Sequence, residues 1–136
     1  AKWAKKSFLF LTVKPRDAGS VVALLRNDPC PCVLVSACPG VPLWKLREEF
    51  TRKGFSRVSL VRIMPNVLCA LGEGSTCYCE DGLSDELREL LLRLLRAFGI
   101  VHSVPEMYFD AYCAVSGSSR QPKMPSKPQA LQPRRL

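Results

Sequence analysis

The segment from Arg57 to Asn66 constrains the fold of this chain more than any other. It is rich in apolar and β-branched residues, which is typical of a strand buried inside a sheet. Pro65 has no backbone N–H and a fixed φ, so we expect the strand to stop at Met64-Pro65-Asn66. Ligands of open parallel sheets bind at the carboxyl ends of the strands. The end of this strand, with the amide side chain of Asn66, is therefore a candidate ligand-binding edge.

Two similar apolar segments precede this strand, and patterns typical of helices lie between the three. Crossovers of that length suit parallel pairing of the strands. The expected strands are 7–13, 32–37, 57–66, 75–79 and 100–104, and the expected helices are 17–27, 43–53, 84–98 with Ser84 as its cap, and one from Glu106 to 115. This order predicts an α/β, partly Rossmann-like fold with a mostly parallel sheet of about five strands and flanking helices.

The net charge of +8 is carried by the two ends of the chain. Residues 1–16 and 120–136 each contain five basic and no acidic residues, whereas the body between them is slightly acidic. A basic tail is usually a solvated extension, so specific nucleic-acid binding is not expected. The last part is rich in Ser, Gly and Pro and cannot bury a core. We expect one domain over 1–118 and a disordered, Pro-rich basic tail over 119–136.

Seven cysteines are many for a chain of 136 residues, but their spacing does not suit a metal site. Cys30/Cys32 and Cys77/Cys79 are C-x-C pairs rather than the C-x2-C pairs of zinc ribbons, and His102 is the only histidine. We expect Cys77 and Cys79 to pack as small apolar residues on one strand face, without a metal. No secretory signal or membrane span is recognisable, so we expect reduced thiols and an intracellular, cytoplasmic protein.

The ends of the first three strands carry residues that suit a nucleotide. Lys14 could meet a phosphate, the small residues after the second strand would let a flat ring approach the backbone, and Asn66 offers a donor and an acceptor. At any one of these ends, ordinary turn residues would give the same pattern. Together they predict a surface for one half of a dinucleotide.

In their order and spacing, these segments resemble those of pyrroline-5-carboxylate reductase, the NAD(P)H-dependent enzyme that makes proline. The resemblance covers roughly residues 6–118 and rests on the whole set, because each segment is short. It implies hydride transfer from a nicotinamide to the imine carbon of pyrroline-5-carboxylate, with catalysis mostly by placement. The segments are Val13-Lys14-Pro15, Val35-Ser36 with Gly40-Val41, Arg62-Ile63-Met64-Pro65-Asn66, Glu73-Gly74, Asp110-Ala111 and Ser116-Gly117-Ser118.

The resemblance also implies the site residues, although no individual catalytic residue. NADP or NAD is the implied cofactor, and the preference between them is open because the discriminating residue of the family lies in a part that this chain does not match. Pro39 stands where the family usually has a small residue with a free amide. The cofactor side is matched by Val13, Lys14, Pro15, Ala37, Cys38 and Asn66, and the entry to the substrate region by Ser116, Gly117 and Ser118.

Two parts of the family have no counterpart in these 136 residues. One is the first strand with its G-x-G-x-x-G turn, which holds the pyrophosphate. The other is a helical domain that forms the family's homo-oligomer and completes the pyrroline site. The chain also begins at Ala1 rather than at methionine. We therefore expect a fragment or an incomplete gene model, inactive alone and with weak or absent cofactor binding.

Other interpretations stay open. The chain could be a non-catalytic remnant that binds a partner through its basic tail or through the apolar edge of its first strand, left open without the missing strand. It could be another Rossmann-type reductase, such as a deazaflavin-linked one, although that class should lack the pair of Met-Pro-Asn and Ser-Gly-Ser. A nucleophilic role for Cys38 or Ser118 is disfavoured, because the only histidine lies on a predicted strand and no pairing with it can be argued.

Overall fold

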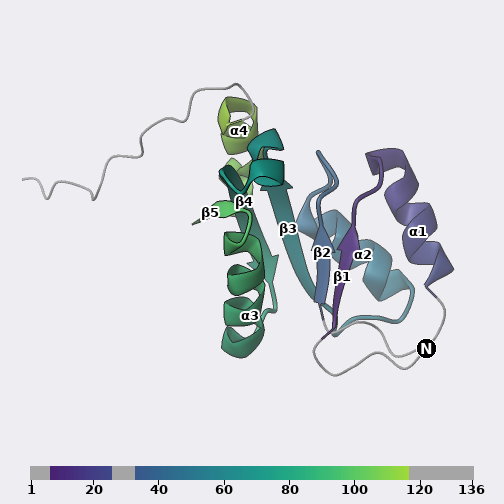
Figure 1. Cartoon of the computed structure of the whole chain (residues 1–136). Helices are drawn as coiled ribbons and strands as arrows, with labels where there is room; N and C mark the ends of the chain where they lie inside the picture. Colours follow the sequence, from purple (N-terminus) through teal and green to yellow (C-terminus); the bar gives the residue numbers. More distant parts are fainter. Residues whose placement is uncertain (1–6, 26–32, 117–136) are drawn as a thin grey trace, which may run out of the picture.

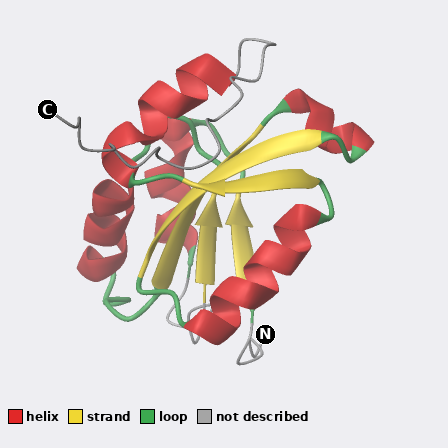
Figure 2. Ribbon diagram, turned by 90° about the vertical axis from the view of Figure 1, so that its left-hand side faces the viewer, coloured by secondary structure: helices red, strands yellow, loops and turns green. Residues whose placement is uncertain are grey.

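The computed structural model describes residues 7–25 and 33–116. They form one five-stranded sheet in the order β1-β2-β3-β4-β5, with helices on both faces (Figures 1 and 2). The strands are β1 (Phe8–Leu11), β2 (Val33–Ser36), β3 (Ser59–Pro65), β4 (Gly74–Asp81) and β5 (Gly99–Ser103). The helices are α1 (Ala18–Leu24), α2 (Leu43–Arg52), α3 (Asp85–Arg96) and α4 (Glu106–Ser116), with short 3-10 helices η1 (Pro15–Asp17) and η2 (Val67–Leu71).

The first three strands run parallel, and their ends lie at one edge of the sheet (Figure 1). Leu11, Ser36 and Arg62 are level with one another in the register. β4 pairs antiparallel with β3, and β5 runs parallel to β4. The α/β fold with a mostly parallel sheet of five strands, predicted from the sequence, is confirmed.

Each face of the sheet has its own apolar core, because side chains alternate along a strand. On one face, Leu34 and Leu60 pack in a cluster with Phe50 of α2 and Phe109 of α4. On the other face the sheet packs against α3, through Val33, Val35, Val61, Ile63, Leu91, Leu92 and Leu95. All four residues of β2 are buried, as expected of a strand covered on both sides.

Helix α3 begins where the sequence predicts. The Ser84 hydroxyl accepts a hydrogen bond from the Leu87 amide at 3.4 Å. Asp85 and Glu86 lie in its first turn and Arg93 and Arg96 in its last, the arrangement that its dipole favours. The first helix is shorter than the expected 17–27: α1 runs from Ala18 to Leu24, and Asp17 is the last residue of η1 and the N-cap of α1, where it makes no side-chain cap hydrogen bond.

Strand β3 ends at Pro65, within the segment Met64-Pro65-Asn66 where the sequence predicts that it stops, but Met64 and Pro65 still belong to the ladder, which the sequence did not predict to continue past Ile63. The two residues pair with Cys77 and Thr76 of β4. The Asn66 amide donates to the Ser75 carbonyl at 3.2 Å, and the alternation of antiparallel hydrogen bonds therefore directs the Pro65 nitrogen away from β4. On that side β2 has already ended, so no ladder hydrogen bond is lost.

Strand β4 is longer than the predicted 75–79 at both ends, since it runs from Gly74 to Asp81. It begins shortly after η2, a helix that the sequence did not predict. The Gly74 amide donates to the Phe98 carbonyl at 3.0 Å. A Cβ atom at Gly74 would overlap the backbone and sulfur of Cys69. Only glycine permits this close approach of η2 to the start of the strand.

Some predictions concern parts of the chain that the structure does not describe. The division into a domain over 1–118 and a tail over 119–136 stays a prediction. Cys30, Cys32, Gly117 and Ser118 lie outside the described residues. Among the described helices, none has the length and apolar character needed to span a membrane.

Candidate functional site

The structure brings the six residues predicted for the cofactor side to one edge of the sheet, which we call the carboxyl edge. Val13, Lys14 and Pro15 follow the end of β1. Ala37 and Cys38 follow β2, and Asn66 follows β3. The ends of β1 and β2 are level with each other, and β3 continues three residues beyond them, so the first two connections lie side by side and Asn66 lies further out along the same edge.

The connection after β2 is held against the end of β1. The Ala37 amide donates to the Leu11 carbonyl at 2.9 Å, and the Cys38 thiol points to the same carbonyl at 3.7 Å. Cys38 is fully buried, and its amide donates to the Ser36 hydroxyl at 3.3 Å. Cys38 is therefore part of the buried packing under the carboxyl edge. The half-buried Ala37 is the small residue that a ligand could approach.

Lys14 leaves its side chain exposed at the same edge. Its backbone is extended, with φ −65° and ψ 150°, and its carbonyl accepts from the Asp17 amide at 2.9 Å to begin η1. The turn thus fixes the backbone of Lys14 while its ammonium group stays in solvent. An exposed cation at a fixed position can meet an anionic group such as a phosphate.

Asn66 organises the turn after β3. Its Oδ1 accepts hydrogen bonds from the amides of Leu68 and Ser75, each at 3.2 Å. The acceptor of this carboxamide is therefore used within the protein. From the sequence, both the donor and the acceptor of Asn66 were expected to be available to a ligand. In the structure, Nδ2 is the group without an acceptor in the described part of the chain, so it can donate to a ligand.

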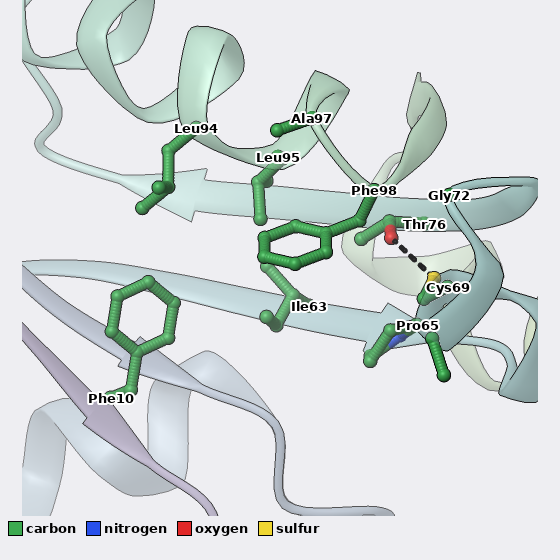
Figure 3. A pocket seen from close by; sticks show the side chains of 11 residues that line it. Phe10, Ile63, Pro65, Cys69, Gly72, Thr76, Leu94, Leu95, Ala97 and Phe98 are labelled. Carbon is green, nitrogen blue, oxygen red and sulfur yellow. Dashed lines mark hydrogen bonds between the residues drawn. The ribbon is translucent and has the colours of Figure 1, made fainter.

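An apolar groove of about 710 Å³ opens beside the carboxyl edge on the α3 face of the sheet. Figure 3 shows Phe10 of β1 opposite Phe98 and Leu95, with Ile63 of β3 between them. Phe10 is 40% exposed and Phe98 48% exposed. Among the described strands β1 lies at the end of the sheet, so its outer edge is open, and the groove begins there.

Arg62 is a buried charged residue below the carboxyl edge, and its role was not predicted from the sequence. Its side chain is 1% exposed in the middle of β3, and its guanidinium lies 4.4 Å from the centre of the Phe109 ring. It forms ion pairs with Asp110 at 2.5 Å and with Glu106 at 3.5 Å, both on α4. A buried charge needs such partners. A basic residue inside an apolar run, with two acids four residues apart on a later helix, was the signal available in the sequence.

Glu106 connects this ion pair to the second connection of the carboxyl edge. Its Oε1 accepts from the Leu43 amide at 2.7 Å, at the first residue of α2. The N-cap of α2 is Pro42, which provides no side-chain hydrogen bond, so Glu106 takes that role from α4. Arg62 and Glu106 thereby join β3, α2 and α4 just below the carboxyl edge.

The predicted substrate region is only partly described. Ser116 is the last residue of α4, and Gly117 and Ser118 follow beyond the described residues. His102 contacts the ring of Tyr112, with centroids 6.1 Å apart, and in the described part of the chain no hydrogen bond joins it to Cys38. The described residues contain no group of three His, Cys, Asp or Glu that could hold a metal.

Proteins with similar sequences are named pyrroline-5-carboxylate reductase. No protein-family model matches the chain. Pyrroline-5-carboxylate reductase from Aquifex aeolicus is 31% identical over 111 residues, which cover 81% of this chain and 40% of that protein. The Mycobacterium leprae reductase is 33% identical over 118 residues, which cover 82% of this chain and 39% of that protein. This chain is homologous to one part of pyrroline-5-carboxylate reductase.

Solved structures of the reductase agree with this assignment. The crystal structure of the Plasmodium falciparum pyrroline carboxylate reductase with NADP bound has a TM-score of 0.67 and 31% sequence identity, and the match covers 79% of this chain and 42% of that one. The chain spans about 40% of the length of the curated reductases that it matches. The resemblance found in the sequence is thereby confirmed.

Proposed function

We propose that this chain is the nicotinamide-binding half of the NAD(P)-binding domain of a pyrroline-5-carboxylate reductase, and that it acts only together with the other parts of such an enzyme. The observation that carries the proposal is that Lys14, Ala37 and Asn66 each follow the end of one of three neighbouring parallel strands. The Plasmodium falciparum reductase, which is similar over 79% of this chain, holds NADP.

The described residues fit one portion of a dinucleotide. The exposed ammonium group of Lys14 would pair with a phosphate. Ala37 leaves room for a flat ring above the backbone, and Asn66 Nδ2 would donate to the carboxamide oxygen of the nicotinamide. When bound, the cofactor supplies the hydride that reduces the imine carbon of the substrate. The residues of this chain contribute by orienting the ring, which is the larger part of catalysis when two reactants must meet.

We expect the 136 residues alone to be inactive. They contain no G-x-G-x-x-G segment, the feature that binds a pyrophosphate through backbone amides and a helix N-terminus. Of the residues proposed for substrate entry, Ser116 ends α4, and Gly117 and Ser118 lie outside the described residues. Cofactor affinity and the pyrroline site would both depend on the segments that complete the reductase.

A chimera tests the proposal. Residues 7–118 replace the matching segment of the Aquifex aeolicus reductase, and NADPH absorbance is followed with pyrroline-5-carboxylate. We expect activity in the chimera and none in the 136-residue chain. In the chimera, Lys14→Ala should raise the KM for NADPH by about tenfold, the effect of losing one charge-assisted contact. The matched variant Lys53→Ala, at the end of α2 on the opposite edge of the sheet, should leave the KM for NADPH unchanged. A folded, oligomeric chimera that does not bind NADPH would exclude the proposal.

A second candidate function is a non-catalytic interaction module that uses the open edge of β1 or the basic tail. The open edge and the exposed Phe10 favour it. It predicts a chimera that folds but does not oxidise NADPH, together with a stable complex between this chain and a separately purified partner on gel filtration. Activity in the chimera would favour the first proposal instead.

A further inference from the structure

Two cysteine thiols meet where α4 packs against β4. The Sγ atoms of Cys77 and Cys113 lie 3.6 Å apart, although 36 residues separate them in the chain. Cys77 is 1% exposed, Cys113 is partly exposed, and neither is in a disulfide. The sulfur atoms of a disulfide are about 2.05 Å apart, so closure requires an approach of about 1.6 Å, which a side-chain rotation with a small shift of the helix can supply.

The other described cysteines have different neighbours. The thiol of Cys38 points to the Leu11 carbonyl, and that of Cys69 to Asn66 Oδ1 and Thr76 Oγ1. Cys79 is buried on the same face of β4 as Cys77, two residues further along the strand. Within the described ranges, the contact between Cys77 Sγ and Cys113 Sγ is the one that joins two cysteine sulfur atoms.

The position of Cys113 on α4 gives this contact a consequence. Glu106, Phe109, Asp110 and Cys113 follow one another at helical spacing, and the first three contact Arg62 of β3. Those contacts hold the first two turns of α4 to the sheet. Cys113 is the next residue on that side, and it lies in the last turn before Ser116. A covalent bond there would fix the end of α4, which the ion pairs do not reach.

We propose that Cys77 and Cys113 form a reversible disulfide that fastens the last turn of α4 to β4 under oxidising conditions. The oxidant is a low-molecular-weight disulfide of the glutathione class. The Cys113 thiol, which is the more exposed, loses its proton and attacks one sulfur of the oxidant, releasing one thiolate that takes up a proton. Cys77 then loses its proton and attacks Cys113 Sγ, which releases the second thiol. Two protein thiols are oxidised by two electrons, and one small disulfide is reduced to two thiols.

The surroundings of the two thiols make this reaction slow. Burial raises the pKa of Cys113, and it raises that of Cys77 to about 12, with a smaller contribution from Cys113. Few thiolates are therefore present near neutral pH, and the thiolate is the attacking species. The disulfide should accordingly respond to sustained oxidation rather than take part in turnover, and it does not depend on the proposed reductase activity.

The test uses the full 136-residue chain. It is incubated in mixtures of reduced and oxidised glutathione, quenched with acid, alkylated and digested without reduction. Cleavage after Tyr78 separates Cys77 from Cys79, so mass spectrometry can assign the partner of Cys113. We expect a Cys77–Cys113 peptide with a mass two hydrogens below the sum of its parts, and a rise of several degrees in Tm that excess reduced glutathione reverses.

Two variants make the result specific. Cys113→Ser should lose both the cross-linked peptide and the rise in Tm. Cys69→Ser, which removes another partly buried thiol, should keep both. A wild-type chain that shows only glutathione adducts, or a link from Cys113 to Cys79, would overturn the proposal. So would a Cys77–Cys113 link that leaves Tm unchanged.

Discussion

A single carboxamide oxygen holds the turn that ends β3. Asn66 Oδ1 accepts from two backbone amides, and it can do so as either an amide or a carboxylate. Its nitrogen is left for a ligand. The two halves of one side chain therefore have separate structural and binding roles, which two substitutions can distinguish.

Asn66→Asp keeps the acceptor and removes the donor, so the turn should persist while cofactor binding weakens. We expect the free energy of unfolding to change by less than about 1 kcal/mol, and the Kd for NADPH of the chimera to rise about tenfold. Asn66→Ala should lose about 1–2 kcal/mol of stability as well, because two amides lose their acceptor. Urea denaturation and a fluorescence titration with NADPH measure the two effects. Unchanged NADPH affinity in Asn66→Asp would show that Nδ2 does not contact the cofactor.

Glu106 is the second residue whose two partners can be tested separately. Glu106→Gln keeps an oxygen for the Leu43 amide but removes the charge that faces Arg62, and should cost about 1 kcal/mol. Glu106→Ala removes both and should cost about 2–3 kcal/mol, because it leaves Leu43 uncapped and Arg62 with one acid. Thermal unfolding of the two variants measures the difference. Equal losses would mean that the cap contributes nothing.

At the scale of elements, the sequence predicted which segments are strands and helices better than where they end. The helix bounded by Ser84 was predictable because its cap, charges and apolar face all agree. The extension of β3 through Pro65 was not, because it depends on β2 ending earlier, which no local pattern shows. The 3-10 helix η2 escaped prediction for a similar reason, since it depends on the close approach of Cys69 to Gly74.

The start of β4 should tolerate no side chain. Gly74→Ala should destabilise the chain by about 2–3 kcal/mol, because the new Cβ would overlap the Cys69 backbone. Gly19→Ala is a matched control, since Gly19 lies exposed within α1 with open space around it, and alanine favours the helix. The free energy of unfolding of Gly19→Ala should be unchanged or higher by about 0.5–1 kcal/mol. Urea denaturation compares the two, and a Gly74→Ala chain as stable as wild type would contradict the packing described here.

At the scale of the whole molecule, the sequence predicted that three strand ends meet at one edge, because helical crossovers impose parallel pairing. Six residues predicted for the cofactor side lie there as a result. The buried ion pair between Arg62 and α4 could not be predicted with equal certainty. It requires knowing that a helix more than forty residues later returns to the same strand.

The open edge of β1 should make the isolated chain prone to self-association. Phe10→Lys places a charge on this edge and should reduce light scattering at high protein concentration with little change in Tm, since Phe10 is already 40% exposed. Leu24→Lys changes a more exposed apolar residue on α1 and should leave the scattering unaltered. A similar decrease in both variants would indicate a general effect of charge instead of edge pairing.

The reversal of direction between β3 and β4 brings two unlike helix ends to the carboxyl edge. Helix α2 starts at this edge, and the partial positive charge of its first turn is met there by the Glu106 carboxylate, which accepts from the Leu43 amide. Helix α3 leads into the start of β5, so it ends at the same edge, and Arg93 and Arg96 in its last turn offset the partial negative charge of its carbonyls. Both helix dipoles are thus balanced by side chains of the chain itself, so an anion that approaches the sheet here is attracted by exposed cations such as Lys14 rather than by the helix ends.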